Sequence, residues 1–335
     1  MNEDAWRTHI PSENTVFMFH RSRTQKGMPY DAFDANLSIH GGVPKQFFSM
    51  KDHTFADWEI PPWELTIFED RMIGQGSFAK VFMAKWRETE VVAKVLDTAF
   101  IREKKHVVLR EIDIMSKLHH PNVVQFFGYV NDPFVIVLEY VPNRDLESKM
   151  GHLRMNTKIN ITRDILKGLI YIHNRKPLDL IHRDIKPSNV LLTRCNVAKI
   201  SDFGLSKFDG TPLSDVTKCV TDIHEDTSSP LVSSGDASQS LAHATMTNNV
   251  GTYRYMSPEM KQRAEYDKRT DIYSCGVLLY ELFEGKRYSP SKGMKWFWCP
   301  KKLRCLICES MLCVDKSSRW DAIQILKQFN RIMKR

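Results

Sequence analysis

Two short polar segments in the middle of this chain constrain its fold more than any other feature. Residues 182–189 read His-Arg-Asp-Ile-Lys-Pro-Ser-Asn, and residues 202–204 read Asp-Phe-Gly. The first places a carboxylate, an ammonium group and a carboxamide on one loop, and the second adds a carboxylate eighteen residues after Asp184 (202 − 184). Together they offer a proton acceptor, a cation and oxygen ligands for magnesium, which are the groups that a phosphoryl transfer requires.

The composition is that of a globular protein with one large domain or two medium ones. The chain has 335 residues, of which 42% are hydrophobic and 26% are charged. It contains no apolar run near the ~18 residues that span a bilayer, and its first residues form no apolar signal region. Seven cysteines without a secretory signal indicate reduced thiols. We therefore expect a cytoplasmic protein, with the nucleus as the alternative.

The chain falls into an extension and two parts of different character. Residues 1–57 show no clear period and predict a poorly ordered extension. From 58 to about 138 the pattern is mostly strand, with one helix. After Pro142 it is mainly helical, with an amphipathic stretch at 159–173 and a strongly apolar one at 271–283. A small β-rich part followed by a larger helical part predicts two lobes with a cleft for a cofactor.

A glycine-containing hairpin is expected at residues 74–81, which read Gly-Gln-Gly-Ser-Phe-Ala-Lys-Val. Glycines let a hairpin close over phosphates and present backbone N–H groups to their oxygens. Two glycines are common in tight hairpins, so this pattern carries weight only beside the other motifs. Because a strand and not a helix follows, the dinucleotide-binding fingerprint is excluded.

Further segments complete the pattern in a fixed order. Residues 91–94 read Val-Val-Ala-Lys, Glu111 follows on the predicted helix, and residues 138–142 read Leu-Glu-Tyr-Val-Pro. With the glycine-containing hairpin and the two polar segments, the sequence from about residue 60 to residue 335 resembles that of a eukaryotic protein kinase.

The resemblance implies an α+β fold of two lobes, the bilobal protein kinase fold. A small β-rich N-lobe with one main helix would span about 58–138, a hinge would follow at 139–142, and a larger, mainly helical C-lobe would span 143–335. The extension at 1–57 would precede a kinase domain at 58–335. The cofactors implied are ATP and Mg²⁺.

The resemblance also assigns residues to the nucleotide. Lys94 would hold the α- and β-phosphates and pair with Glu111. Leu138 would gate the back of the pocket, and backbone groups near Glu139 and Val141 would bind adenine. The implied nucleotide-binding set is Gly74, Gln75, Gly76, Ser77, Phe78, Ala79, Val81, Val92, Lys94, Leu138, Glu139, Val141 and Leu191.

The two polar segments would carry the chemistry. Asp184 would orient the acceptor hydroxyl and take its proton, and Lys186 would neutralise charge on the migrating phosphoryl group. Asn189 and Asp202 would bind magnesium. His182 is expected to be a packing residue. The implied catalytic residues are Asp184, Lys186, Lys94 and Glu111, and the implied metal ligands are Asn189 and Asp202.

The resemblance implies two further contacts. The activation segment would run from Asp202 to Glu259, and its last residues, 251–259, read Gly-Thr-Tyr-Arg-Tyr-Met-Ser-Pro-Glu. Glu259 would form a buried ion pair with Arg319, and Asp271 would tie the first polar segment, residues 182–189, which we term the catalytic loop, to a buried helix. Both roles are structural, because a buried ion pair fixes geometry more than it adds stability.

The activation segment is long for the family. Residues 202–259 number 58 (259 − 202 + 1), and the stretch 208–249 is rich in Ser, Thr, Asp and Gly, which predicts a mobile insert. A phosphate on Thr245 or Thr247, opposite Arg183, would order the segment through charge-assisted hydrogen bonds. Constitutive ordering is the alternative.

One basic stretch stands apart. Residues 286–304 contain seven Lys and Arg residues and no Asp or Glu, with Trp296, Phe297 and Trp298 among them. We expect a solvated basic loop whose aromatic side chains turn into the core. A docking surface for an acidic peptide, an anionic membrane or nucleic acid is the alternative.

The function expected is that of an active serine/threonine protein kinase, which transfers the γ-phosphoryl group of ATP to protein hydroxyls. Lys186 together with Thr252 matches the serine/threonine pattern, and residues 58–65, 120–128 and 253–259 most resemble the tyrosine-kinase-like branch. Protein substrates are implied, with an upstream kinase or autophosphorylation in trans, and no nucleic acid is expected. A pseudokinase scaffold is the main alternative, because Ala79 replaces the usual third glycine and Val92 the usual alanine. A kinase that phosphorylates small molecules is a third possibility.

Overall fold

A computed structural model describes residues 57–76, 78–176, 179–204, 206–208, 253–289 and 292–334. The expected extension, except for Asp57, lies outside the described residues, and so do Ser77 and the stretch 209–252 with Thr245 and Thr247. The chain divides into two compact units. One unit contains the described residues up to Phe100 together with Phe126–Tyr140, and the other contains Ile101–Gln125 and the described residues from Val141 onwards.

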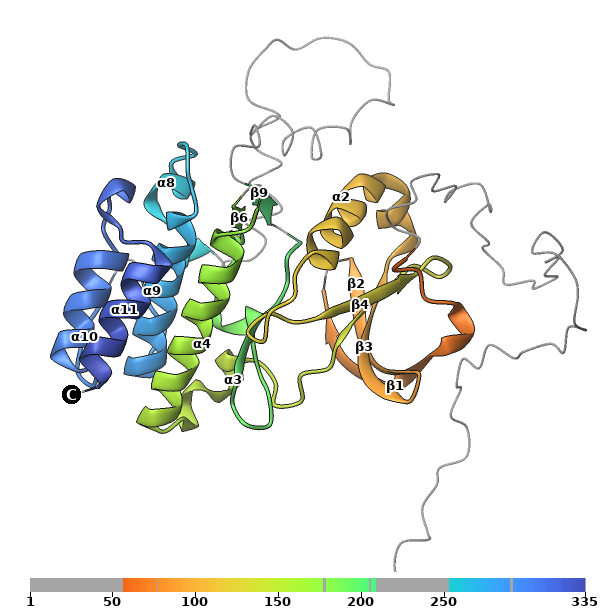
Figure 1. Ribbon diagram of the computed structural model, residues 1–335, viewed down its shortest axis with the longest axis horizontal. Coiled ribbons are helices and arrows are strands. Elements are labelled where there is room, and N and C mark those ends of the chain that lie inside the picture. Colours follow the sequence, from red (N-terminus) through yellow and green to blue (C-terminus); the bar gives the residue numbers. More distant parts are fainter. Residues whose placement is uncertain are drawn as a thin grey trace, which may run out of the picture. The chain divides into compact units, whose positions relative to one another are not determined.

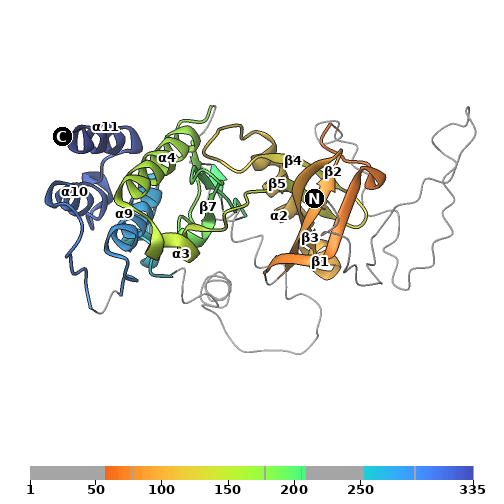
Figure 2. The same cartoon turned by 90° about the horizontal axis from the view of Figure 1, so that it is seen from below.

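A five-stranded antiparallel sheet forms the first unit (Figure 2), in the order β1-β2-β3-β5-β4. Its strands are β1 (Leu65–Gln75), β2 (Ala79–Trp86), β3 (Thr89–Leu96), β4 (Phe126–Val130) and β5 (Val135–Glu139), and the short helix η2 (Pro62–Glu64) precedes them. Side chains alternate between the two faces of a strand. Val91 and Ala93 of β3 are therefore buried in the hydrophobic core of this unit, with Ala84 and Val137 of the neighbouring strands.

Helices make up most of the second unit (Figure 1). They are α3 (Leu146–Lys149), η3 (Met150–His152), α4 (Met155–His173), η4 (Pro187–Asn189), α8 (Pro258–Lys261), α9 (Arg269–Glu284), α10 (Lys301–Leu306), the π-helical turn η5 (Ile307–Met311), η6 (Lys316–Ser318) and α11 (Ala322–Met333). Helix α2 (Thr98–Ser116) begins in the first unit and lies mostly in the second. Two small antiparallel ladders complete the unit: β6 (Leu180–Ile181) with β9 (Lys207–Phe208), and β7 (Val190–Leu192) with β8 (Ala198–Ile200).

The core of the second unit is built on α4 and α9. Helix α4 buries Ile161, Ile165, Leu169 and Ile172, which recur at the spacing of one helix face. Helix α9 is buried on all sides, as expected of a central helix. Helix α4 packs against both α9 and α11 (Figure 1).

The predicted α+β fold is confirmed, with an antiparallel sheet in one unit and a helical second unit. The amphipathic stretch predicted at 159–173 is the C-terminal part of α4, and the apolar stretch at 271–283 lies within α9. In the described residues between α9 and α10 there is no helix. None of the helices described is both long and apolar enough to span a bilayer.

Candidate functional site

The register of the sheet in the first unit brings four predicted nucleotide-binding positions onto one face. Gly74 of β1 lies opposite Val81 of β2, and Val81 lies opposite Lys94 of β3. Val92 lies opposite Leu138 of β5. Directly opposed residues of neighbouring strands share a face, and so do residues two apart. The side chains of Val81, Val92, Lys94 and Leu138 therefore lie on the face of the sheet away from the hydrophobic core.

The glycine-containing hairpin closes through a tight turn. The N–H of Gly76 donates to the carbonyl of Ala79 at 2.8 Å, so the residue that replaces the expected third glycine closes this turn with its backbone. The ring of Phe78 is 50% exposed and stacks on Phe100 at 4.6 Å between centroids. Gln75 ends β1. The backbone of the hairpin thus forms the turn that the motif predicts.

The loop from β6 to β7 in the second unit holds the first polar segment around one carboxylate. Asp184 is buried, and its Oδ2 accepts hydrogen bonds from Lys186 Nζ at 2.7 Å and from Asn189 Nδ2 at 2.9 Å. Asn189 Nδ2 also donates to the carbonyl of Asp184 at 2.9 Å. The base, the cation and one metal ligand of the sequence prediction are therefore in direct contact.

The electrostatic setting of Asp184 favours a proton acceptor. Burial raises the pKa of its carboxyl above the ordinary value, the ammonium group of Lys186 opposes this, and the carboxylate of Asp202 adds to it. Two carboxylates that repel each other form a site where a divalent cation is stabilised.

Asp202 is held next to this loop by the residue before it. The N–H of Ser201 donates to the carbonyl of Asn189 at 2.9 Å, and its Oγ donates to the same oxygen at 3.1 Å. Asp202 has a left-handed backbone with φ 62° and an exposed side chain. A methyl group added to Gly204 would lie 3.5 Å from Asp202 Oδ1 and 3.6 Å from Glu111 Oε2. Glu111 of α2 therefore lies beside the Asp-Phe-Gly segment.

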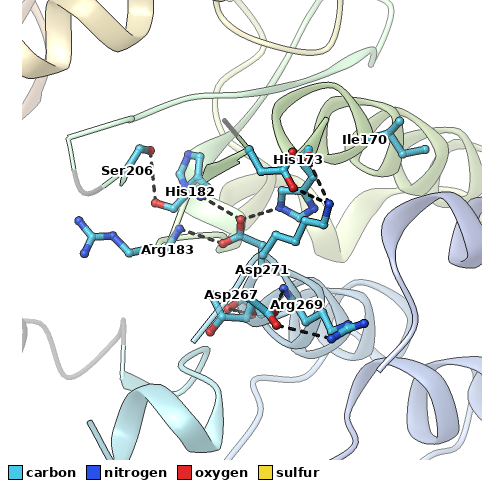
Figure 3. A network of polar contacts seen from close by, with 12 residues as sticks. Ile170, His173, His182, Arg183, Ser206, Asp267, Arg269 and Asp271 are labelled. Carbon is cyan, nitrogen blue, oxygen red and sulfur yellow. Dashed lines mark hydrogen bonds and ion pairs between the residues drawn. The ribbon is translucent and has the colours of Figure 1, made fainter. Parts of the chain in front are cut away.

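Asp271 anchors the catalytic loop to α9, as the sequence predicted (Figure 3). Its fully buried carboxylate accepts from the N–H of His182 at 2.9 Å and from the N–H of Arg183 at 2.8 Å. Arg183 has a left-handed backbone with φ 69°, a conformation that costs free energy outside glycine. The two hydrogen bonds to one carboxylate hold the loop in that conformation.

His173 is a partner of Asp271 that the sequence did not reveal. Its Nε2 lies 2.8 Å from Asp271 Oδ2, and both side chains are buried (Figure 3). Burial alone would raise the pKa of Asp271, but the hydrogen bond and charge of His173, with His182, hold the pKa below its ordinary value. A polar residue ending an otherwise apolar helix face was the signal in the sequence.

Replacing Asp271 with asparagine is expected to destabilise the protein by about 1.5–3 kcal/mol at neutral pH, because a charged acceptor of three buried hydrogen bonds is lost. The folded pKa of Asp271 is lowered from its ordinary 3.8. Its stabilisation is therefore fully present above that value and lost as the pH falls through the folded pKa. Urea unfolding of both proteins over pH 3–7 would measure this. A difference between them that grows on acidification would contradict the assignment.

His182 packs as expected and also fixes the loop. Its ring is fully buried, meets Phe203 edge to face at 4.8 Å, and through Nε2 donates to the carbonyl of Ser201 at 3.0 Å. The N–H of Asp184 donates to His182 Nδ1 at 3.3 Å. The imidazole thus joins the two polar segments.

The predicted ion pair of Glu259 and Arg319 is confirmed. Arg319 Nη1 and Nη2 donate to the two carboxylate oxygens of Glu259 at 2.6 and 2.7 Å, and the Arg319 guanidinium also donates to the carbonyls of Cys313 and Val314. Burial alone would raise the pKa of Glu259, but the hydrogen bonds from Arg319 hold it below the ordinary value. A bidentate pair with further hydrogen bonds can offset the desolvation of both charges.

The remaining predicted residues lie in different units. Val141 and Leu191, the latter on β7, belong to the second unit, and Glu139 ends β5 in the first. Lys94 and Glu111 also fall in different units, and their ion pair stays a prediction.

The chemistry of the donors fits magnesium. The ion prefers oxygen ligands and is bound in such sites by one or two carboxylates together with phosphate oxygens. Asp202 supplies an exposed carboxylate. The amide nitrogen of Asn189 is committed to Asp184, so the carbonyl oxygen is the atom that this side chain offers to a cation.

Comparison with known proteins agrees with this geometry. The family described as "protein kinase domain" matches residues 68–329. Serine/threonine-protein kinase VIK of Arabidopsis thaliana is 37% identical over 245 residues, 69% of this chain and 49% of the relative. From the same plant, integrin-linked protein kinase 1 is 32% identical over 236 residues (68% and 44%), and serine/threonine-protein kinase CTR1 is 33% identical over 235 residues (68% and 25%). The chain spans half or less of these relatives.

Proposed function

This chain belongs to the protein kinase family, and we propose that it is an active serine/threonine kinase that transfers the γ-phosphoryl group of ATP to hydroxyl groups of proteins. The resemblance to serine/threonine kinases of the tyrosine-kinase-like branch is confirmed by relatives that include VIK and CTR1. We place the protein in the cytoplasm as part of this proposal.

The observation that carries the proposal is the arrangement of Asp184. Both hydrogen bonds to its carboxylate reach Oδ2, from Lys186 and Asn189. Among the described residues no donor reaches Oδ1. This oxygen can therefore accept the proton of a substrate hydroxyl while the rest of the group is held in place. A buried carboxylate with a raised pKa accepts that proton more readily than an exposed one.

Lys186 has two tasks in this mechanism. Its ammonium group orients the base through the 2.7 Å hydrogen bond to Asp184. The same positive charge is placed to stabilise negative charge on the phosphoryl group as it moves to the hydroxyl. Because these groups come from one short loop fixed by Asp271, they need little rearrangement when the reaction proceeds.

Asn189 and Asp202 would hold Mg²⁺, which when bound neutralises the phosphate oxygens of ATP. In the first unit, Lys94 and the turn at Gly76 would face the phosphates. The apolar side chains of Val81, Val92 and Leu138, which share the face of the sheet with Lys94, would contact the adenine ring. The side chain of Val92 has two carbon atoms more than that of alanine and would narrow the space for the adenine ring.

Regulation by activation-loop phosphorylation is the second part of the proposal. Arg183 is a buried residue, and its Nη1 donates a hydrogen bond to Tyr266 Oη at 3.1 Å. A phosphate on Thr245 or Thr247, which lie outside the described residues, would compete with the Tyr266 hydroxyl for this guanidinium through stronger, charge-assisted hydrogen bonds. An upstream kinase or a second copy of the chain would supply the phosphate.

The experiment that tests the proposal is autophosphorylation of the purified chain with Mg²⁺ and γ-labelled ATP, beside an Asp202→Asn control. We expect label in the wild type and none above background in the control, because the control lacks the metal ligand. Mass spectrometry would locate the phosphates. If a phosphate on Thr245 or Thr247 raises the activity through Arg183, the variant Arg183→Gln should lose that increase.

A chain that binds ATP without transferring phosphate would contradict the proposal and support the pseudokinase. For that conclusion, added protein substrates and a variant with Thr245→Glu and Thr247→Glu must also give no incorporation. Transfer to a small molecule in the absence of transfer to protein would overturn the proposed substrate class.

A further inference from the structure

The loop between α9 and α10 is fixed to α9 through two buried side chains. Tyr280 Oη accepts a hydrogen bond from the N–H of Lys295 at 3.2 Å and donates to the carbonyl of Lys295 at 3.3 Å. One helical turn later, the carboxylate of Glu284 accepts from three consecutive N–H groups, those of residues 297, 298 and 299, at 2.9–3.2 Å. The segment 295–299, which we term the aromatic loop, therefore has a defined backbone.

The three aromatic residues of this loop point in different directions, which corrects the expectation that all of them turn into the core. Trp296 meets Tyr280 edge to face at 4.9 Å between ring centroids. Phe297 and Trp298 instead are 65% and 71% exposed, the largest exposures among the aromatic side chains described. The ammonium group of Lys286 lies 4.8 Å from the centre of the Phe297 ring. The loop thus presents two large adjacent apolar side chains to solvent.

The backbone of the aromatic loop suits an apolar surrounding. A backbone N–H that enters a hydrocarbon-like environment without a hydrogen-bond partner is strongly unfavourable. At Phe297, Trp298 and Cys299 this cost is already removed, because Glu284 accepts all three N–H groups. The two exposed rings can therefore leave water without exposing unpaired N–H groups of these three residues to an apolar phase.

The charged residues of the sequence stretch that contains the loop are all basic. Seven cationic residues and no acidic one lie between 286 and 304. Arg287 is bound by Glu147 at 2.6 Å. The other six form no ion pair with an acidic side chain in the part of the chain that the structure describes: Lys286, Lys292, Lys295, Lys301, Lys302 and Arg304. Such a surface attracts an anionic partner.

We propose that the aromatic loop and its flanking lysines bind the surface of an anionic lipid bilayer, with Phe297 and Trp298 inserted at the level of the headgroups. Tryptophan and phenylalanine beside lysine and arginine are the combination that favours this interface. An acidic peptide that added to the loop as a strand would need free backbone N–H groups, and those of residues 297–299 are occupied. A bilayer needs none. The proposal does not depend on kinase activity.

The test is sedimentation of the full-length chain with vesicles of phosphatidylcholine alone and with vesicles that also contain phosphatidylserine. We expect the affinity for the anionic vesicles to exceed that for the neutral ones by about ten-fold or more, and to fall as salt is added. Replacing both rings (Phe297→Ser with Trp298→Ser) is expected to weaken binding about ten-fold or more. The matched control is Trp63→Ser, because Trp63 is 60% exposed but lies in the first unit. It should bind as the wild type does.

A second variant, Lys301→Gln with Lys302→Gln, should weaken binding to the anionic vesicles and leave the weak binding to neutral ones unchanged. Equal binding by the ring variant and the wild type would overturn the proposal, and so would equal binding to neutral and anionic vesicles. Retention on immobilised polyglutamate with no binding to vesicles would assign the loop to an acidic protein segment instead. Because all of the substituted side chains are exposed, melting temperatures should stay unchanged.

Discussion

Replacing Asp184 with asparagine is expected to slow phosphoryl transfer by about 10²–10⁴-fold, the range that a positioned general base contributes. The amide is close to the carboxylate in size, so the contacts of Oδ2 with Lys186 and Asn189 can be kept. The amide group, however, cannot take the proton of the substrate hydroxyl. The measurement is kcat with a generic protein substrate at saturating ATP, together with the affinity for ATP, which should change little.

A matched control for this variant is Asp113→Asn. Asp113 of α2 pairs at 2.6 Å with Lys117, just past the end of the helix, and their side chains are 37% and 50% exposed, so the pair contributes little. Its activity should equal that of the wild type. If Asp184→Asn kept more than about a tenth of the wild-type kcat, proton transfer to this residue would contribute less than a general base does, and the role would have to be reassigned.

The secondary-structure elements that were predicted correctly come from segments with a strong local period. The alternation in β3, with Val91 and Ala93 on one face and Val92 and Lys94 on the other, is readable in the sequence because side chains of a strand alternate. The amphipathic stretch in α4 is readable because apolar residues recur at the spacing of one helix face. The contacts of Asp271 and Glu259 were predicted from resemblance, which supplies pairings that a single sequence does not contain.

His173 and Tyr266 were missed because their partners are distant in the chain, and Glu284 was missed although its partners lie only 13–15 residues away. His173 lies 98 residues from Asp271, and Tyr266 lies 83 residues from Arg183. A single sequence gives no register between segments so far apart. Glu284 did carry a local signal: it is an acidic residue in the last turn of α9, where the helix dipole disfavours negative charge and no basic residue compensates. Such a conflict indicates a tertiary partner, here three N–H groups.

The directions of Trp296, Phe297 and Trp298 were not predictable for a related reason. Three consecutive aromatic residues show neither a helix nor a strand period, so the sequence alone favoured burial of them all. Glu284 and Tyr280 fix the backbone, and the backbone then decides which ring reaches the core. The pairing of Lys94 with Glu111 and the events at Thr245 and Thr247 stay predictions.

Replacing Arg319 with leucine is expected to destabilise the protein by about 3–5 kcal/mol, because it leaves the carboxylate of Glu259 buried without its cation. Arg319 is among the largest fully buried side chains, and the carbonyls of Cys313 and Val314 also lose a donor. The measurement is the free energy of unfolding in urea at pH 7. Because the folded pKa of Glu259 lies below its ordinary value of 4.5, the stabilisation by the pair is present above that pH and is lost as the pH falls through the folded pKa.

Two comparisons separate this effect from a general loss of packing. The nitrogen–oxygen distance in the pair of Arg287 and Glu147 is 2.6 Å, as short as in the pair of Arg319 and Glu259. The side chains of Arg287 and Glu147, however, are 67% and 37% exposed. Replacing Arg287 with leucine should therefore cost less than about 1 kcal/mol. Adding Glu259→Gln to Arg319→Leu removes the uncompensated charge, and the double variant should therefore recover part of the lost free energy of unfolding. Strict additivity of the two substitutions would contradict a coupled pair, since neighbours that share a buried charge interact by about 0.5–3 kcal/mol.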